Sequence, residues 1–177
     1  MADVRGLAHP LIATARLRLR PFTLDDAPFI VELVNDPDWL RYIGDKRVRT
    51  DEDARRYLRD GPLASYARHG FGLLAVETRA DGRAIGMCGL LKRDALPDAD
   101  VGFAFLPAAR GHGYAAEALG AVLADAPASH GLRRVLAITS PGNARSIAAL
   151  EKAGFRFERT ARLADDADEV RVYALNL

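Results

Sequence analysis

The sequence has little of several features that mark particular classes of protein. One cysteine excludes a disulfide within the chain and fits the reducing cytosol. No long apolar run stands near the N-terminus, which argues against a signal peptide or a membrane span. The 25 Lys and Arg nearly balance the 24 Asp and Glu, so no nucleic acid is implied as a partner. Neither the cysteine nor the four histidines show metal-ligand spacing. We expect a cytoplasmic protein without a metal.

The 177 residues, 49% of them hydrophobic, are enough for one domain with a sizeable core. No internal repeat or low-complexity linker divides them. We expect a flexible N-terminal arm over residues 1–13 and a single domain over residues 14–177.

The hydrophobic periodicity and the turn signals predict an α+β protein. We expect one mixed sheet with helices on both faces. Residues 36–49 are expected to be a loop, and Thr50 to cap the second helix. The predicted strands are 15–21, 71–78, 83–91, 100–106, 132–139, 155–161 and 169–176, and the predicted helices are 24–35, 51–68, 113–126 and 144–153.

The most informative segment is Arg-Gly-His-Gly-Tyr-Ala-Ala, residues 110–116. It stands between an apolar strand that ends at Leu106 and a helical pattern that we expect Pro127 to stop. Glycines let backbone N–H groups turn toward one point, the helix N-terminus adds partial positive charge, and Arg110 adds a full one. The segment therefore predicts a binding site for the phosphates of a cofactor.

A dinucleotide site is an alternative, because Gly111, Gly113 and Ala116 fit a relaxed G-x-G-x-x-A pattern. That pattern requires a strand that leads directly into the first glycine, and a carboxylate after the next strand to hold a ribose. Here residues 107–110 intervene, and the next strand ends in Ser-Pro-Gly-Asn. A glycine-rich turn that binds nothing is the other alternative.

The second informative segment runs from Asn143 to Phe155. Asn143 is a natural helix cap, and Gly154 stands where a helix often ends in a left-handed residue. Arg-x-x-Gly-x-Ala at 110–115, Asn-x-x-Ser at 143–146 and Glu-Lys-Ala-Gly-Phe at 151–155 together resemble the GNAT family of acyl-CoA-dependent N-acetyltransferases. Within it, the chain is most similar to the RimJ/RimL-type group of ribosomal-protein N-terminal acetyltransferases.

The resemblance extends over nearly the whole chain. Residues 16–22 resemble the first strand of the group, residues 35–54 its first two helices and their connection, residues 82–86 its hairpin, and residues 172–175 its last strand. It implies a GNAT-like domain in which two central strands splay apart and acetyl-CoA binds between them. The residues that it implies for this cofactor are Phe103, Phe105, Arg110, Gly111, His112, Gly113, Tyr114, Ala115, Asn143 and Arg145.

The backbone N–H groups near Phe103 and Phe105 would hold the pantetheine arm and polarise the thioester carbonyl. Ser146 matches the position of the proposed general acid of the group, although it could instead only support the helix cap. Tyr173 is a second candidate acid, or a packed aromatic residue. The amine would attack directly, without a covalent enzyme intermediate.

The candidate general base is Asp100, where the group often has glutamate; an exposed carboxylate at the start of a strand is the alternative. A weak base suits an α-amine of pKa ~8, of which roughly a tenth is neutral at pH 7, better than a lysine amine of pKa ~10.4.

Trp39 and Tyr42 are expected to shape the acceptor pocket, although Trp39 could be a core anchor. His112 should act through its backbone, and Cys88 should be a buried small hydrophobe.

These expectations describe an acetyl-CoA-dependent N-acetyltransferase, monomeric or homodimeric, with a protein N-terminal α-amine as the leading acceptor. A small-molecule amine, such as a polyamine, an aminoglycoside or an amino-acid derivative, is the alternative substrate. A non-catalytic acyl-CoA-binding sensor is the alternative outside enzymes.

Overall fold

The N-terminal segment of the chain is only partly described. The computed structural model describes residues 11–177, so most of the arm predicted over residues 1–13 lies outside the described residues. Ile12 and Ala13 form a short strand, β1, which pairs antiparallel with Leu19 and Arg18 of β2 (Leu17–Pro21). These two residues therefore belong to the sheet, which corrects that boundary of the predicted arm.

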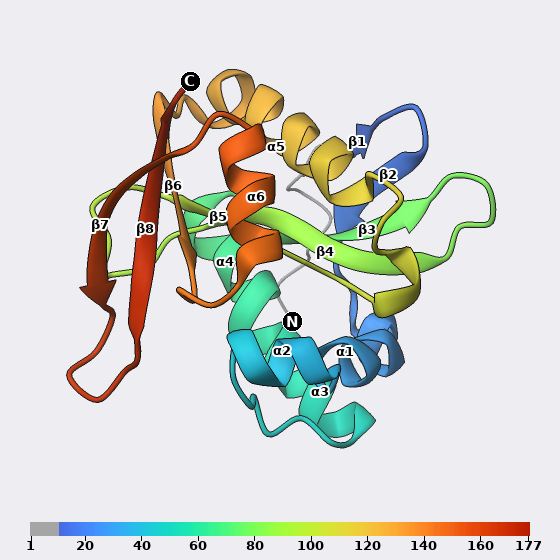
Figure 1. Cartoon of the computed structure of the whole chain (residues 1–177). Helices are drawn as coiled ribbons and strands as arrows, with labels where there is room; N and C mark the ends of the chain where they lie inside the picture. The colour runs from blue at the N-terminus through green and yellow to red at the C-terminus, as the bar shows by residue number, and fades with distance from the viewer. Residues whose placement is uncertain (1–10) are drawn as a thin grey trace.

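One sheet organises residues 11–177, and its strand order is β1-β2-β3-β4-β5-β6-β8-β7 (Figure 1). All neighbours are antiparallel except β5 and β6, which are parallel. The mixed, mostly antiparallel sheet of the α+β prediction is thus confirmed. The remaining strands are β3 (Leu73–Thr78), β4 (Ala84–Leu91), β5 (Asp100–Phe105), β6 (Arg134–Thr139), β7 (Arg156–Arg162) and β8 (Glu169–Asn176).

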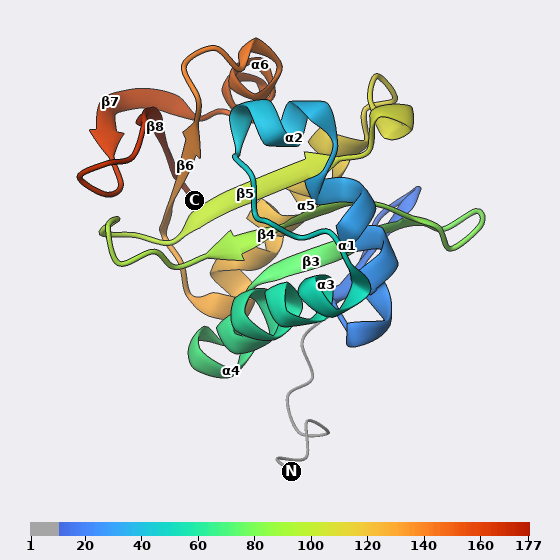
Figure 2. The ribbon, with the colours of Figure 1, turned by 90° about the horizontal axis from the view of Figure 1, so that it is seen from below.

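Helices cover both faces of the sheet, as expected (Figure 2). Val76 of β3 packs in the core that contains α5 and α6, whereas its neighbour Ala75 packs in the core that contains α1 and α3. This alternation follows from the two-residue period of a strand. The helices are α1 (Ala27–Val34), α2 (Pro37–Tyr42), α3 (Asp51–Leu58), α4 (Ala64–His69), α5 (Tyr114–His130) and α6 (Ala144–Lys152).

The prediction of a loop over residues 36–49 is wrong for its first part, which forms α2. The Asp36 side chain accepts a hydrogen bond from the Trp39 backbone N–H at 3.3 Å, and Pro37 takes the first helical position. Both are helix-start signals. The helix is too short for a clear hydrophobic period, and the burial of Trp39 against the core holds it in place.

Proline does not stop the helices where the sequence suggests. Helix α5 continues through Pro127 to His130, because a proline in the last turn removes only one helical bond. Gly131 then closes the helix in a left-handed conformation, with φ of 65°, and its N–H donates to the Pro127 carbonyl at 3.0 Å. The helix predicted over 51–68 is formed as α3 and α4, joined by a π-helical turn at Arg59–Leu63 that accommodates Pro62.

Candidate active site

Strands β5 and β6 are splayed apart. Their only register pair in the described chain is Asp100 with Leu136, where the Leu136 N–H donates to the Ala99 carbonyl at 2.9 Å. Beyond that point the strands diverge (Figure 2). The splay implied by the resemblance is therefore present, and it opens toward the C-terminal end of β5.

The free edge of β5 offers backbone donors to this gap. The Leu106 N–H donates to Ile85 at 2.9 Å on the β4 side, whereas the Ala99 carbonyl faces β6. Because backbone groups alternate along a strand, the N–H groups of Phe103 and Phe105 face the gap. Over residues 11–177, no strand pairs with this edge at either position. These are the two residues predicted to hold a pantetheine arm.

The glycine loop follows at the end of the gap. Gly111 and Gly113 have φ of 79° and 80°, a left-handed conformation that costs glycine little. Gly113 is the N-cap of α5, and within residues 11–177 no side chain caps the first turn of that helix. The first N–H groups of α5 are therefore available to an anion, and phosphate binding by this segment stays a prediction.

Arg16 of the segment before β2 braces the loop from outside. Its Nη1 donates to the His112 carbonyl at 2.8 Å, and its Nε donates to Glu117 Oε2 at 2.7 Å. Its guanidinium also lies 4.5 Å from the centre of the Tyr114 ring. The sequence predicts only a place in a strand for Arg16, because no local signal indicates a contact about a hundred residues away.

Arg110 does not stand free over the loop. Its Nη2 lies 2.6 Å from Asp36 Oδ2 and its Nη1 lies 2.9 Å from Asp38 Oδ2, both at the start of α2. Arg145 of α6 reaches the same Asp38 oxygen at 3.3 Å. Two carboxylates thus offset the full positive charge that we expected Arg110 to give the loop. The phosphate-binding roles of Arg110 and Arg145 stay predictions.

One cleft of about 760 Å³ joins these parts. Its walls come from β5, the glycine loop, α2 and the start of α6. His112 is not among its lining residues; its ring stacks on Tyr114, with Nδ1 2.9 Å from the Arg110 carbonyl. The predicted site residues that line the cleft are Trp39, Tyr42, Phe103, Phe105, Arg110, Gly111, Gly113, Tyr114, Ala115, Asn143, Arg145 and Ser146.

The candidate acid Ser146 lies in the first turn of α6. The Asn143 side chain accepts from the Ser146 backbone N–H at 3.2 Å, which confirms Asn143 as the helix cap. The Ser146 hydroxyl itself has no hydrogen-bond partner among the described residues, and the residue lines the cleft. The cap therefore does not use the hydroxyl, which leaves it available for chemistry.

Asp100 and Tyr173 are not among the residues that line the cleft. Asp100 is completely buried, which corrects the alternative of an exposed carboxylate, and its Oδ2 lies 3.1 Å from Arg93 Nε. Burial raises the pKa of the Asp100 carboxyl, and the charge of Arg93 opposes this shift. Its Oδ1 has no partner within residues 11–177.

Tyr173 is also fully buried, and its hydroxyl has no described partner. It packs edge-on against Phe157 and belongs to the core beneath α5 and α6.

Trp39 is buried too, although it lines the cleft, so it contributes to both the core and the cleft wall. Cys88 is buried as expected, and burial raises the pKa of its thiol to about 12.

Within residues 11–177, no helix is both long and apolar enough to cross a membrane. In the same part of the chain, no group of three or more His, Cys, Asp or Glu side chains is placed to hold a metal ion.

Comparisons with known proteins agree with this geometry. A family model described as an acetyltransferase (GNAT) domain matches residues 16–156. The uncharacterized N-acetyltransferase YnaD of Bacillus subtilis (strain 168) is 28% identical over 147 residues, 83% of each chain. An acetyltransferase from Agrobacterium tumefaciens str. C58 is 25% identical, with a TM-score of 0.80 over 95% of each chain. RimL, the ribosomal L7/L12 alpha-N-protein acetyltransferase solved with coenzyme A, shares the fold at 18% identity, with a TM-score of 0.81 over 95% of this chain and 98% of its own.

Proposed function

The chain belongs to the GNAT acetyltransferases, and from that premise we propose that it moves an acetyl group from acetyl-CoA to a primary amine. The proposed leading acceptor is a protein N-terminal α-amine, as in the RimJ/RimL-type group. The observation that carries the proposal is the single cleft that joins the free edge of β5 to the N-terminus of α5.

The residues of the cleft fit acetyl-CoA. The N–H groups of Phe103 and Phe105 would bind the amide-rich pantetheine arm as a neighbouring strand does. The N–H groups of residues 111–115, aimed by two left-handed glycines, would bind the pyrophosphate. A volume of about 760 Å³ lies within the usual range for sites that enclose a small molecule.

Acetyl-CoA supplies the activated acetyl group when it is bound, and the chain supplies proton transfer. As the amine attacks and the thioester C–S bond breaks, Ser146 Oγ, half-buried at the start of α6, would protonate the departing CoA thiolate. Asp100 Oδ1 would accept the proton from the amine through a bridging water, because the residue is buried and does not line the cleft. Its raised pKa brings this base nearer to neutral pH, where general-base catalysis is more effective.

Two observations bear on the acceptor. The ion pair with Arg93 opposes the rise in the pKa of Asp100 and so weakens this base, which suits an amine of low pKa. RimL, which shares the fold, is named as an alpha-N-protein acetyltransferase.

A small-molecule amine remains the alternative substrate. A non-catalytic acyl-CoA sensor is the second candidate function, and the position of Asp100 outside the cleft lining favours it.

Thiol release from acetyl-CoA tests the proposal when it is measured over peptides that begin with Ser or Ala, a polyamine and an aminoglycoside. We expect turnover with at least one peptide. Turnover with the polyamine or the aminoglycoside alone would show that the acceptor is a small-molecule amine and not a protein N-terminus. Binding of acetyl-CoA in calorimetry without turnover on any amine would favour the sensor.

A further inference from the structure

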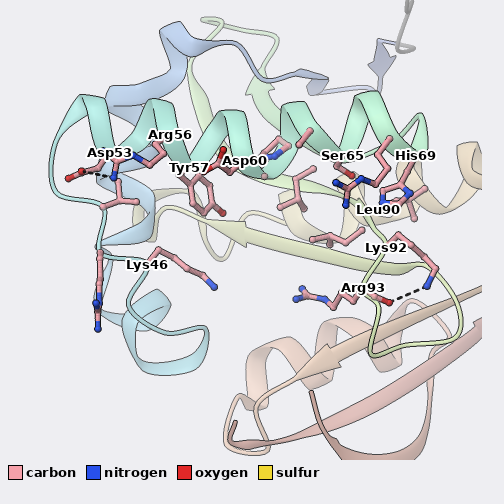
Figure 3. A pocket seen from close by; sticks show the side chains of 18 residues that line it. Lys46, Asp53, Arg56, Tyr57, Asp60, Ser65, His69, Leu90, Lys92 and Arg93 are labelled. Carbon is pink, nitrogen blue, oxygen red and sulfur yellow. Dashed lines mark hydrogen bonds and ion pairs between the residues drawn. The ribbon is translucent and has the colours of Figure 1, made fainter. Parts of the chain in front are cut away.

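A second cavity, of about 560 Å³, lies outside the cofactor cleft (Figure 3). Its floor is formed by Leu73 of β3 and by Leu90 and Leu91 at the end of β4. Helices α3 and α4, with the π-helical turn between them, form one wall, and residues 46–48 and 92–93 form the rim. We call it the cationic pocket, for the charge of its lining.

Positive charge dominates the lining. Only Asp53 and Asp60 are acidic, although the whole chain carries a net charge of only +1. Arg56 lies 3.8 Å from Asp53 and Arg93 lies 3.1 Å from Asp100. Lys46 and Arg68 line the pocket without an ion pair to any residue of 11–177. The cationic side chains are Lys46, Arg47, Arg56, Arg68, Lys92 and Arg93.

Three donors converge within the pocket. Lys46 and the guanidinium of Arg93 point toward one another across it, and the Tyr57 ring descends from α3 toward the same space (Figure 3). Loss of solvent and the charge of Arg93 both lower the pKa of Lys46. Burial raises the pKa of Tyr57 to about 12, so its hydroxyl keeps its proton and can donate. Two facing cations and a neutral donor form a site that suits an anion.

We propose that the cationic pocket binds the carboxylates of an acidic acceptor peptide, between Lys46, Arg93 and Tyr57. This inference rests on the proposed acetyl transfer and names its substrate class. The cations are spread, with Arg56 and Lys92 toward opposite ends of the pocket (Figure 3). A ligand with several separated carboxylates can meet this spread, whereas one compact anion cannot.

Arg93 links this pocket to the candidate base. Its Nε donates to Asp100 Oδ2, and its remaining guanidinium N–H groups are left for a ligand. Asp100 pairs with Leu91, whose side chain lines the pocket, so the two sites share a strand pair. An acidic residue held in the pocket would therefore lie beside the end of β5 that bears Asp100.

Calorimetry with two amidated tripeptides, Ser-Glu-Glu and Ser-Gln-Gln, tests the proposal without requiring turnover. We expect the acidic peptide to bind about tenfold more tightly, the scale of one charge-assisted hydrogen bond. Lys46→Gln should remove most of this preference, and Tyr57→Phe, which keeps the ring, should reduce it. Arg133→Gln, which removes an exposed cation outside the pocket, should leave it unchanged.

Equal affinity for the two peptides would overturn the proposal, as would a preference that survives Lys46→Gln. Inorganic phosphate is the probe for a compact anion, and phosphate binding tighter than the acidic peptide would also overturn it. Because none of these measurements uses acetyl-CoA, failure here is distinguishable from failure of the proposed acetyl transfer.

Discussion

The two ends of β5 form sites by different means. At the C-terminal end, the cofactor cleft presents backbone N–H groups of a free strand edge, a glycine loop and a helix start. At the N-terminal end, the proposed site consists of side chains from separate segments, namely Asp100, Arg93, Lys46 and Tyr57. The first site depends on backbone conformation and the second on charge. Mutations at the two ends should therefore have effects of different kinds.

The largest expected effect belongs to Ser146→Ala. If the hydroxyl donates a proton, kcat should fall about 10²–10⁴-fold, with little change in acetyl-CoA affinity. The melting temperature should change little, because the cap uses the Ser146 backbone N–H. Steady-state kinetics and thermal unfolding of the same sample measure both.

Asn143→Ala is the matched control for Ser146→Ala. It removes the cap itself, so it should lower the free energy of unfolding by about 1 kcal/mol. If the Ser146→Ala enzyme keeps its kcat within threefold of the wild-type value, Ser146 is not the general acid, and the proton comes from Tyr173 or from solvent.

Gly113→Val should weaken acetyl-CoA binding at least tenfold. Valine is strained at φ of 80°, and its Cβ would lie 3.3 Å from the Arg16 guanidinium that braces the loop. Gly120→Val is the control, since Gly120 is exposed in α5 and an added Cβ there meets nothing within 4 Å. Calorimetry should show the loss in the first variant only; equal affinities would place the cofactor elsewhere.

Arg93→Gln should change the pH dependence rather than the cofactor affinity. Arg93 opposes the upward pKa shift that burial gives Asp100, so its removal raises that pKa further. As the pH falls, Asp100 is then protonated at a higher pH than in the wild type. The acid limb of the kcat/KM profile for a neutral acceptor therefore shifts to higher pH. An unmoved limb would exclude Asp100 as the base. Arg133→Gln controls for the lost charge.

His112→Ala should have the smallest effect, within about twofold on acetyl-CoA affinity, because the loop binds through its backbone. The His112 side chain is exposed and does not line the cleft. A loss as large as that of Gly113→Val would show that the imidazole itself binds the cofactor.

The same contrast explains what the sequence could predict. Glycine positions, helix caps and strand patterns are local, so the fold, the glycine loop and the Asn143 cap could be predicted. Long-range partners leave no local pattern: Arg110 meets Asp38 across 72 residues, and Arg16 meets Glu117 across 101. The cationic pocket likewise joins α3, a rim loop and the end of β4, and its members look like ordinary surface charges in the sequence.

Thermal unfolding with and without acetyl-CoA tests the central claim most directly. Acetyl-CoA should bind only the folded chain, so a hundredfold excess over its Kd should stabilise the fold by ~2.7 kcal/mol. For a chain of this size, that corresponds to a rise in melting temperature of roughly 5–10 °C. A melting curve unmoved by millimolar acetyl-CoA and by CoA, or moved further by NADH, would contradict the assignment of the cofactor cleft.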